Sequence, residues 1–263
     1  MLLHILFCGV SVAASTVLFT AIPSLSLWWL PFTLVGGYAA SFLLLVLGTV
    51  LFSCFVQSAK PSGVRRTFYR LVARLAQWAC LLCGMRVKAE GVDHLPTDRP
   101  FLLVGNHLSN LDPLVALAAL RGYETAFVSK PENFKIPVVG LVMRNAAFLP
   151  IDRENPRNAV ATIKKAAELI VTRSLCIGIY PEGTRNKSGE GLLPFHNGSF
   201  KIATTAKCPI AVLTLRYEKS SFPYRRVACI RVVEVLGADY VTANRTDAIS
   251  ERARAIIEKD LKN

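Results

Sequence analysis

The chain has 263 residues, enough for one ordinary domain and additional segments. Hydrophobic residues make up 52% and the mean hydropathy is +0.39, values that argue against a wholly soluble protein. The formal net charge of +13 indicates an anionic partner, and because no nucleic-acid recognition motif accompanies it, lipid headgroups are favoured over nucleic acid.

The N-terminal stretch contains no Asp, Glu, Lys or Arg from residue 2 to residue 59. It holds two apolar runs, at 5–22 and 32–56, with Trp28 and Trp29 between them. A helix of about 20 apolar residues crosses a bilayer, and tryptophan suits the interface. We therefore predict that residues 1–59 form a transmembrane helical hairpin. Two alternatives stay open: a cleaved signal peptide over 1–22, although the usual basic start is missing, and a hairpin that dips into one leaflet.

The next segment sets the predicted orientation. Seven basic residues, from Lys60 to Lys88, precede the first acidic residue, Glu90. Basic residues that flank a membrane span stay on the cytoplasmic side. Everything after residue 60 is therefore expected to face the cytoplasm.

Residues 60–84 include a predicted amphipathic helix. Helical spacing places Arg66, Arg70 and Arg74 on one side and apolar residues such as Phe68 and Trp78 on the other. This pattern is typical of a helix that lies in a membrane interface and contacts anionic lipids. The alternative is a helix of the following domain, packed on its core.

From residue 85 to residue 263 the pattern alternates between strands and helices. Helical periodicity follows Asn155-Pro156 and recurs over 247–262. The alternation predicts an α/β domain. Short β-rich runs occur at 101–105, 125–129, 146–151, 175–180, 210–216 and 226–235.

His107 and Asp112 are candidates for acid–base chemistry. His107 follows the predicted strand 101–105, and the junction of strand and helix is where α/β folds place their chemistry. A spacing of five puts two residues about 140° apart on a helix, so these meet only if Ser109-Asn110 makes a turn. Once paired, the carboxylate fixes the tautomer of a histidine that acts as general base. The alternative is that Asp112 only caps the helix that begins at Pro113.

A second polar segment, Tyr180–Arg185, follows the predicted strand 175–180. Gly183 lets backbone approach a ligand closely, and Arg185 is able to clamp a phosphate. Arg153 ends a third strand-like run. Taken singly, each arginine is more simply explained as a surface residue of a turn, but three polar strand ends that converge on one edge favour a shared site. The sequence has no nucleotide-binding glycine motif, no serine-hydrolase elbow and no clustered metal ligands.

These segments together resemble a known family. Asn106-His-Leu-Ser-Asn-Leu-Asp112 resembles the NHxxxxD motif of the glycerol-3-phosphate and lysophosphatidate acyltransferases. Pro150-Ile-Asp-Arg153, Tyr180–Arg185 and Cys208-Pro-Ile210 resemble the second motif, the PEGTR motif and the fourth motif, in order, across roughly residues 85–235. NHxxxxD alone is a weak signal, and PEGTR downstream makes it a strong one.

The resemblance implies a mixed sheet flanked by helices, a glycerolipid acyltransferase-like fold. It implies O-acyl transfer from acyl-CoA or acyl carrier protein to the 2-hydroxyl of 1-acylglycerol 3-phosphate (lysophosphatidate), which gives phosphatidate in phospholipid synthesis. His107 and Asp112 would be catalytic, with no metal and no bound cofactor. The implied residues that bind the phosphate-bearing acceptor are Arg153, Glu182, Gly183, Thr184 and Arg185.

Two departures from the family pattern bear on this interpretation. Leu108 stands where the family often has Gln, a position without proton chemistry, and His196-Asn197 stands where basic residues often follow Leu-Pro-Phe. The second departure concerns how phosphate is held. The alternatives are therefore another lysophospholipid or an aminolipid as acceptor and, more remotely, a non-enzymatic module that binds anionic membranes. We expect an integral protein of the cell membrane whose catalytic domain faces the cytoplasm.

Overall fold

The computed structural model describes residues 2–56, 63–152, 156–188, 191–221 and 226–262. Contacts within the chain divide it into two compact units, Met1–Phe52 and Ser53–Asn263. The helix that follows the apolar stretch therefore belongs to the same unit as the α/β domain.

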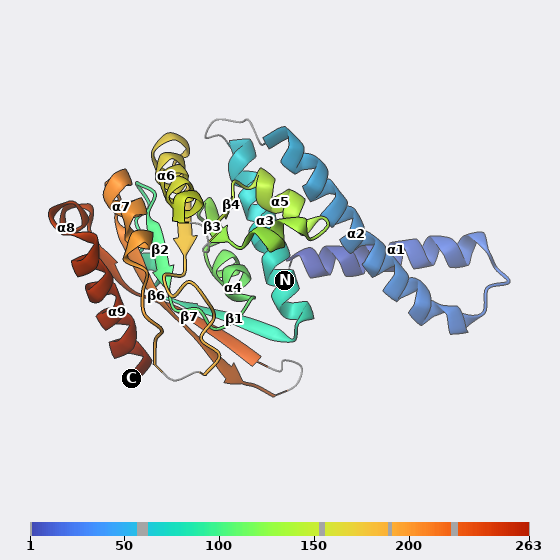
Figure 1. Ribbon diagram of the computed structural model, residues 1–263. Coiled ribbons are helices and arrows are strands. Elements are labelled where there is room, and N and C mark those ends of the chain that lie inside the picture. Colours follow the sequence, from blue (N-terminus) through green and yellow to red (C-terminus); the bar gives the residue numbers. More distant parts are fainter. Residues whose placement is uncertain (1, 57–62, 153–155, 189–190, 222–225, 263) are drawn as a thin grey trace. The chain divides into compact units, whose positions relative to one another are not determined.

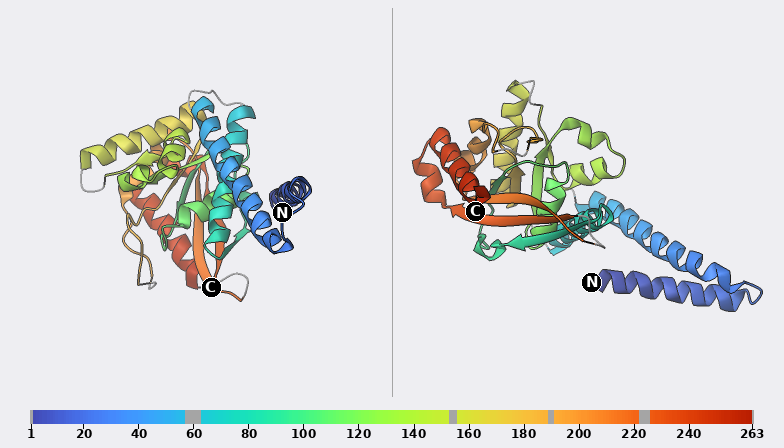
Figure 2. Two further views of the ribbon diagram at one scale, coloured as in Figure 1. Left: turned by 90° about the vertical axis from the view of Figure 1, so that its right-hand side faces the viewer. Right: turned by 90° about the horizontal axis from the view of Figure 1, so that it is seen from below.

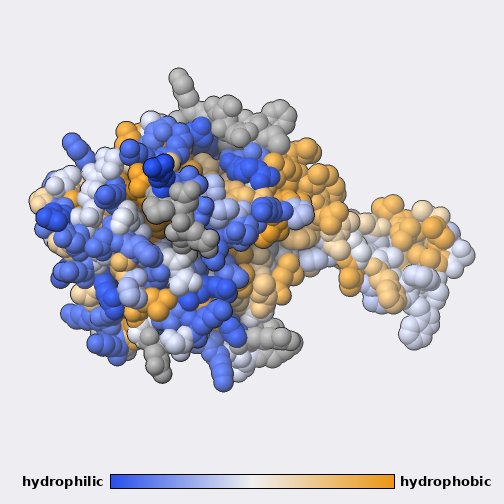
Figure 3. Space-filling model, viewed as in Figure 1, coloured by the Kyte–Doolittle hydropathy of each residue, from blue (hydrophilic) through white to orange (hydrophobic). Residues whose placement is uncertain are grey.

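The first unit contains α1 (Leu2–Ala21), a short 3-10 helix (η1, Leu27–Trp29) and most of α2 (Leu30–Val56), as Figure 1 shows. The two helices approach closely at one point, where a Cβ atom added to Gly37 would lie 3.0 Å from the Cα of Ser11. Small residues at such a contact let two apolar helices pack. The outer side chains of this unit are largely hydrophobic and exposed (Figure 3).

By length and composition, one helix among the described residues is able to cross a membrane. It spans Leu27–Phe52, 26 residues with a mean hydropathy of 2.1. The apolar helix Leu6–Ala21 is shorter. The predicted helix–turn–helix arrangement is confirmed, and the crossing of the membrane by both helices stays a prediction.

The second unit is an α/β domain. The described residues form a seven-stranded sheet of order β1-β7-β6-β2-β5-β3-β4 (Figure 1). Neighbouring strands are parallel except β6 and β7, which are antiparallel, so the sheet is mixed, as the resemblance implies. The strands are β1 (Met85–Glu90), β2 (Leu102–Gly105), β3 (Thr125–Ser129), β4 (Leu149–Pro150), β5 (Cys176–Ile179), β6 (Ile210–Lys219) and β7 (Arg226–Leu236).

Helices cover both faces of the sheet (Figures 1 and 2). α3 (Gly63–Leu82) and α4 (Asp112–Ala119) contact β1 on one face, while α6 (Pro156–Arg173) and α9 (Thr246–Lys262) contact β5 and β6 on the other. Every residue of β2 and β5 is buried, as expected for parallel strands between two helical layers. The remaining helices are η2 (Val92–His94), η3 (Pro131–Lys135), α5 (Val139–Asn145), η4 (Asn197–Phe200), α7 (Lys201–Ala206) and α8 (Ala238–Ala243).

Five of the six predicted strands are confirmed to within a few residues. The sixth, 146–151, is wrong for most of its length: only Leu149–Pro150 pairs with β3, because α5 extends to Asn145 and Ala146 ends that helix. The sequence did not predict β1. Its charged residues Arg86, Lys88 and Glu90 weaken the strand signal, and the strand pairs only with β7 at the edge of the sheet.

The amphipathic helix predicted at the start of this unit is present as α3, but its apolar face packs on the domain. Phe68 and Trp78 are buried, so they are not available to lipid, and the alternative of a domain helix describes this face correctly. Arg65 is also buried, and its guanidinium Nε lies 2.5 Å from the carboxylate of Glu124. Arg66, Arg70 and Arg74 are exposed and remain free to contact a membrane surface.

Candidate active site

The segments after β2 and β5 lie side by side because these strands are parallel neighbours. The backbone N–H of Asn186 donates to the carbonyl of His107 at 2.7 Å. The backbone N–H of His107 in turn donates to Oε1 of Glu182 at 2.7 Å. The structure therefore brings the predicted histidine and the Tyr180–Arg185 segment together at one edge of the sheet.

His107 and Asp112 are in direct contact. Nδ1 of His107 lies 2.7 Å from Oδ2 of Asp112. The segment between them is not helical, so the separation about a helix axis does not apply. Oδ2 also accepts the backbone N–H groups of Leu108 at 2.7 Å and Ser109 at 2.8 Å. Because these amides precede α4, the carboxylate folds back over the turn, and the alternative of a simple helix cap is not favoured.

The pair is enclosed. The Asp112 side chain is fully buried, and that of His107 is 14% exposed. The His107 ring stacks on Tyr180, with centroids 4.5 Å apart and an angle of 10° between the planes. A carboxylate accepts only, so Nδ1 carries the proton and Nε2 is the ring nitrogen with an open lone pair. Among the described residues Nε2 has no hydrogen-bond partner, which suits a general base.

Two polar residues that sequence reasoning missed complete the enclosure. The hydroxyl of Tyr217 donates to Oδ1 of Asp112. The side-chain amide of Asn106 donates to the carbonyl of Leu215 at 2.9 Å and accepts that residue's N–H at 2.8 Å. Asn106 opens the NHxxxxD segment, so its motif was a usable signal, whereas Tyr217 lies one residue past a predicted strand and belongs to no motif.

The Tyr180–Arg185 segment begins with a tight turn. The N–H of Gly183 donates to the carbonyl of Tyr180 at 3.1 Å, and Gly183 has φ 71°, a conformation that favours glycine. Glu182 within the turn is buried. Its Oε1 accepts from His107, and its Oε2 accepts the N–H of Leu193 at 3.0 Å. Backbone donors thus engage both carboxylate oxygens of Glu182, a residue that the family resemblance assigns to acceptor binding.

The remaining predicted binding residues differ in what the structure describes. Arg185 is half-buried and has no acceptor among the described residues, while Thr184 is exposed. Arg153 lies outside the described residues. Arg185 is therefore a cation without a counter-ion in the described protein, and the next residue, Asn186, is bonded to the backbone of His107.

A pocket of about 330 Å³ extends from this site between α6, α7 and the end of β5. It reaches Tyr180 and Gly183, and its walls are mainly apolar. Lys164, Lys201 and His196 also line it, and its lining includes no acidic residue in the described chain. The full lining is Ile151, Ala159, Val160, Ile163, Lys164, Ile179, Tyr180, Gly183, His196, Gly198, Ser199, Lys201 and Thr205.

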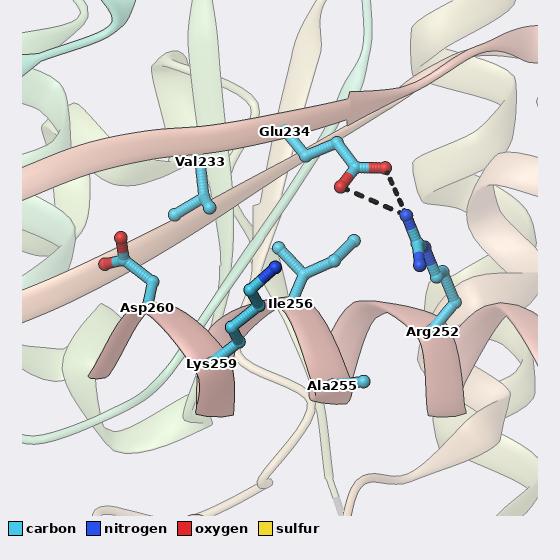
Figure 4. Close-up of a pocket in the computed structure, with 7 residues that line it drawn as sticks. All are labelled: Val233, Glu234, Arg252, Ala255, Ile256, Lys259 and Asp260. Atoms are coloured by element: carbon cyan, nitrogen blue, oxygen red, sulfur yellow. Dashed lines mark hydrogen bonds and ion pairs between the residues drawn. The ribbon is translucent and has the colours of Figure 1, made fainter. Parts of the chain in front are cut away.

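A second pocket, of about 280 Å³, lies between β7 and α9 (Figure 4). An ion pair between Arg252 and Glu234, with N and O 3.0 Å apart, crosses one end of it. None of the predicted site residues lines it. Among the described residues no three His, Cys, Asp or Glu side chains are grouped so as to hold a metal ion. The pocket beside Tyr180 is therefore the one associated with the candidate site.

Comparisons with known proteins show what this chain is similar to. A family model described as acyltransferase matches residues 86–216. The chain is 30% identical over 179 residues to 1-acyl-sn-glycerol-3-phosphate acyltransferase alpha of Homo sapiens, which covers 66% of this chain and 62% of that protein. It is 35% identical over 152 residues to a chloroplastic 1-acyl-sn-glycerol-3-phosphate acyltransferase of Brassica napus, which covers 57% of this chain and 43% of that one. The chain thus spans less than two thirds of the length of these curated relatives.

The fold has a solved counterpart. The crystal structure of the 1-acyl-sn-glycerophosphate acyltransferase PlsC from Thermotoga maritima matches with a TM-score of 0.64 and 20% identity, covering 84% of this chain and 94% of that one. At this identity the likeness concerns the fold. The family match includes both polar segments, and residues 86–216 therefore form a domain of the acyltransferase family.

Proposed function

We propose that the protein is an O-acyltransferase that transfers an acyl chain to the 2-hydroxyl of 1-acylglycerol 3-phosphate and forms phosphatidate. The observation that carries the proposal is the enclosed His107–Asp112 pair beside the glycine turn of Tyr180–Arg185. The names of the relatives supply the acceptor, since each acts on 1-acyl-sn-glycerol 3-phosphate by its description. The donor is an acyl thioester, acyl-CoA or acyl carrier protein.

His107 acts as general base in this mechanism. Its Nε2 takes the proton of the acceptor hydroxyl while the hydroxyl oxygen attacks the thioester carbonyl. The tetrahedral intermediate then breaks the carbon–sulfur bond, and the imidazolium returns the proton to the departing thiolate. Asp112, 2.7 Å from Nδ1, keeps the tautomer and stabilises the imidazolium between the two steps.

Arg185 binds the acceptor phosphate together with Thr184 and the Gly183 backbone. Arg153, which the sequence also predicts to bind this phosphate, lies outside the described residues. A guanidinium holds a phosphate by two parallel hydrogen bonds, and Arg185 has no carboxylate partner in the described protein to compete for them. The basic residues of the neighbouring pocket add positive charge for the same phosphate. Its apolar walls suit the hydrocarbon part of the lysolipid.

The membrane is part of this proposal because both substrates carry acyl chains. The apolar hairpin anchors the protein in the cell membrane with the domain in the cytoplasm, and the exposed arginines of α3 contact anionic lipid. Anchoring keeps the site near substrates that partition into the bilayer.

An assay of the purified full-length protein tests the function. Acyl-CoA and acyl carrier protein donors are each combined with lysophosphatidate, other lysophospholipids and an aminolipid. We expect phosphatidate, and a loss of turnover by a factor of about 10² to 10⁴ in His107→Ala with fold and membrane association retained. Full activity of the His107→Ala variant would rule out the proposed mechanism. Turnover of a different acceptor alone would assign the enzyme to that acceptor. If no donor–acceptor combination gave transfer, the protein would be a membrane-binding module.

A further inference from the structure

The two oxygens of the Asp112 carboxylate are held differently. Oδ2 accepts from the ring of His107 and from the backbone N–H groups of Leu108 and Ser109. Oδ1 has a single donor among the described residues, the hydroxyl of Tyr217. Because the Asp112 side chain is fully buried, water does not replace a missing donor.

The register between β6 and β2 places Tyr217 at this oxygen. β6 has 10 residues and β2 has four, and their pairing ends at Gly105 opposite Leu213. Beyond that point the side-chain amide of Asn106 takes over, since it bonds to both the N–H and the carbonyl of Leu215. Tyr217 follows two residues later, and its hydroxyl reaches Asp112 in the segment that begins at Asn106.

We infer that Tyr217 is a positioning residue for proton transfer: it holds Oδ1 of Asp112 and thereby keeps Oδ2 directed at Nδ1 of His107. The inference rests on the proposed function, in which His107 is the base. Without the hydroxyl, Oδ1 would be buried with no donor, and rotation of the carboxylate toward other donors would release the imidazole from its tautomer.

Other titratable groups face the pair, and they do not replace this contact. Tyr180 and Glu182 approach from the segment after β5, and Cys80 approaches Tyr217 from α3. The Tyr180 hydroxyl is buried without a hydrogen-bond partner in the described chain, so its ring, not its hydroxyl, meets His107. Burial and the Asp112 carboxylate raise the pKa of Tyr217, which keeps its hydroxyl protonated as a donor.

Tyr217→Phe in the full-length protein tests the inference. We expect kcat to fall about ten- to a hundredfold, the effect of losing a hydrogen bond to a charged group, with KM for both substrates unchanged. The acid limb of the pH–rate profile should move to lower pH, because a carboxylate that turns away from Nδ1 no longer stabilises the imidazolium.

Tyr69→Phe is the matched control. Tyr69 is also buried, and its hydroxyl donates to the carbonyl of Ala146 at 2.9 Å, outside the site. It should lose stability without moving the pH–rate profile. An unchanged kcat and profile in Tyr217→Phe would overturn the inference, as would an equal profile shift in Tyr69→Phe. A change confined to KM would make Tyr217 a substrate ligand instead.

A readout that does not need turnover separates this inference from the proposed function. The ¹⁵N shifts of the His107 ring report which nitrogen carries the proton. We expect Nδ1–H in the parent protein and a mixture of tautomers in Tyr217→Phe. If the parent protein turns over no acyl donor but the tautomer still changes, the proposed function fails and the positioning contact stands. An unchanged tautomer overturns the positioning role whatever the activity.

Discussion

The backbone N–H of His107 donates a 2.7 Å hydrogen bond to Oε1 of Glu182, and this bond joins the segment after β2 to the segment after β5. Oε2 of the same carboxylate accepts the N–H of Leu193 at 3.0 Å. One buried side chain therefore fixes the backbone of the histidine against two other segments. We propose that Glu182 supports the site in this way, in place of the substrate contact that its motif suggests.

Glu182→Gln should weaken both fold and activity. The amide keeps one acceptor oxygen but turns its NH₂ group toward a backbone N–H, so two donors face each other. We expect the free energy of unfolding to fall by about 1–3 kcal/mol, the cost of an unmatched buried polar group, and kcat to fall with it. Thermal unfolding in detergent and steady-state kinetics measure the two effects. Parent-like values of both would contradict the supporting role.

Glu182 also predicts a pH dependence of stability. Burial raises the pKa of its carboxyl, while the N–H groups of His107 and Leu193 oppose the shift. A raised folded pKa means that the folded protein binds the proton more tightly than the unfolded chain. The stability contribution is thus complete below the ordinary glutamate pKa of about 4.3 and is lost as pH rises through the raised value.

The stability advantage of the parent protein over Glu182→Gln should accordingly shrink as pH increases across that window. Melting temperatures of both proteins, measured at matched pH values, check this. An advantage that grows with pH would show that the two backbone donors outweigh burial.

Asp112→Asn should separate geometry from charge. The amide oxygen is able to accept at the Oδ2 position, and the NH₂ group to donate to the Tyr217 oxygen, so the hydrogen bonds survive. The negative charge that stabilises the imidazolium is lost. We expect kcat to fall about 10²- to 10⁴-fold with little change in melting temperature. Asp112→Ala should lose both the hydrogen bonds and the charge, so its kcat and its melting temperature should both fall. An equal fall in melting temperature in the two variants would show that the charge itself stabilises the fold.

The local parts of the fold and site could be predicted from the sequence. The strands β2 and β5 have uninterrupted apolar stretches, and the polar residues that follow them are close in the chain, so His107 and the Tyr180–Arg185 segment could be placed at strand ends. Their meeting at one edge follows from parallel pairing, which the sequence pattern implies.

What depends on register between distant segments could not be predicted. Tyr217 reaches Asp112 across 105 positions of sequence, and only the pairing of β6 with β2 aligns them. Likewise, Glu182 accepts a second backbone N–H only because the chain brings Leu193 back beside it, 11 residues later in the sequence. The apolar side of α3 has the same spacing whether lipid or protein covers it, so its pattern could not decide between the two.

Two adjacent lysines of α6 offer a matched test of the pocket beside Tyr180. Lys164 lines it, whereas Lys165 lies at the surface with its Nζ 2.7 Å from Glu168. Lys164→Ala should raise the KM for lysophosphatidate about two- to fivefold, the effect of one exposed charge pair, and the effect should vanish at high salt. Lys165→Ala should leave this KM unchanged. Equal effects, or an effect on the donor KM alone, would remove the pocket from the acceptor site.

The end of α3 presents two cysteines in opposite environments, and they report on its contact with a membrane. Cys80 is buried, and burial raises the pKa of its thiol to about 11. Cys83 is exposed, next to Leu82, which is 72% exposed. In detergent a polar maleimide should modify Cys83 and spare Cys80, as read by peptide mass spectrometry. Modification of Cys80 at a comparable rate would contradict its burial.

In lipid nanodiscs the same reaction tests whether α3 lies on the membrane. Arg66, Arg70 and Arg74 are exposed, and each basic residue near an anionic surface contributes about 1 kcal/mol. Anionic lipid should therefore slow the labelling of Cys83 relative to zwitterionic lipid, and replacing the three arginines with glutamine should abolish the difference. Added salt should abolish this difference too, because the electrostatic screening length falls to about 3 Å at 1 M salt. Protection that persists in salt would mean that Leu82 inserts into the bilayer, and no protection in anionic lipid would exclude surface contact at this end of α3.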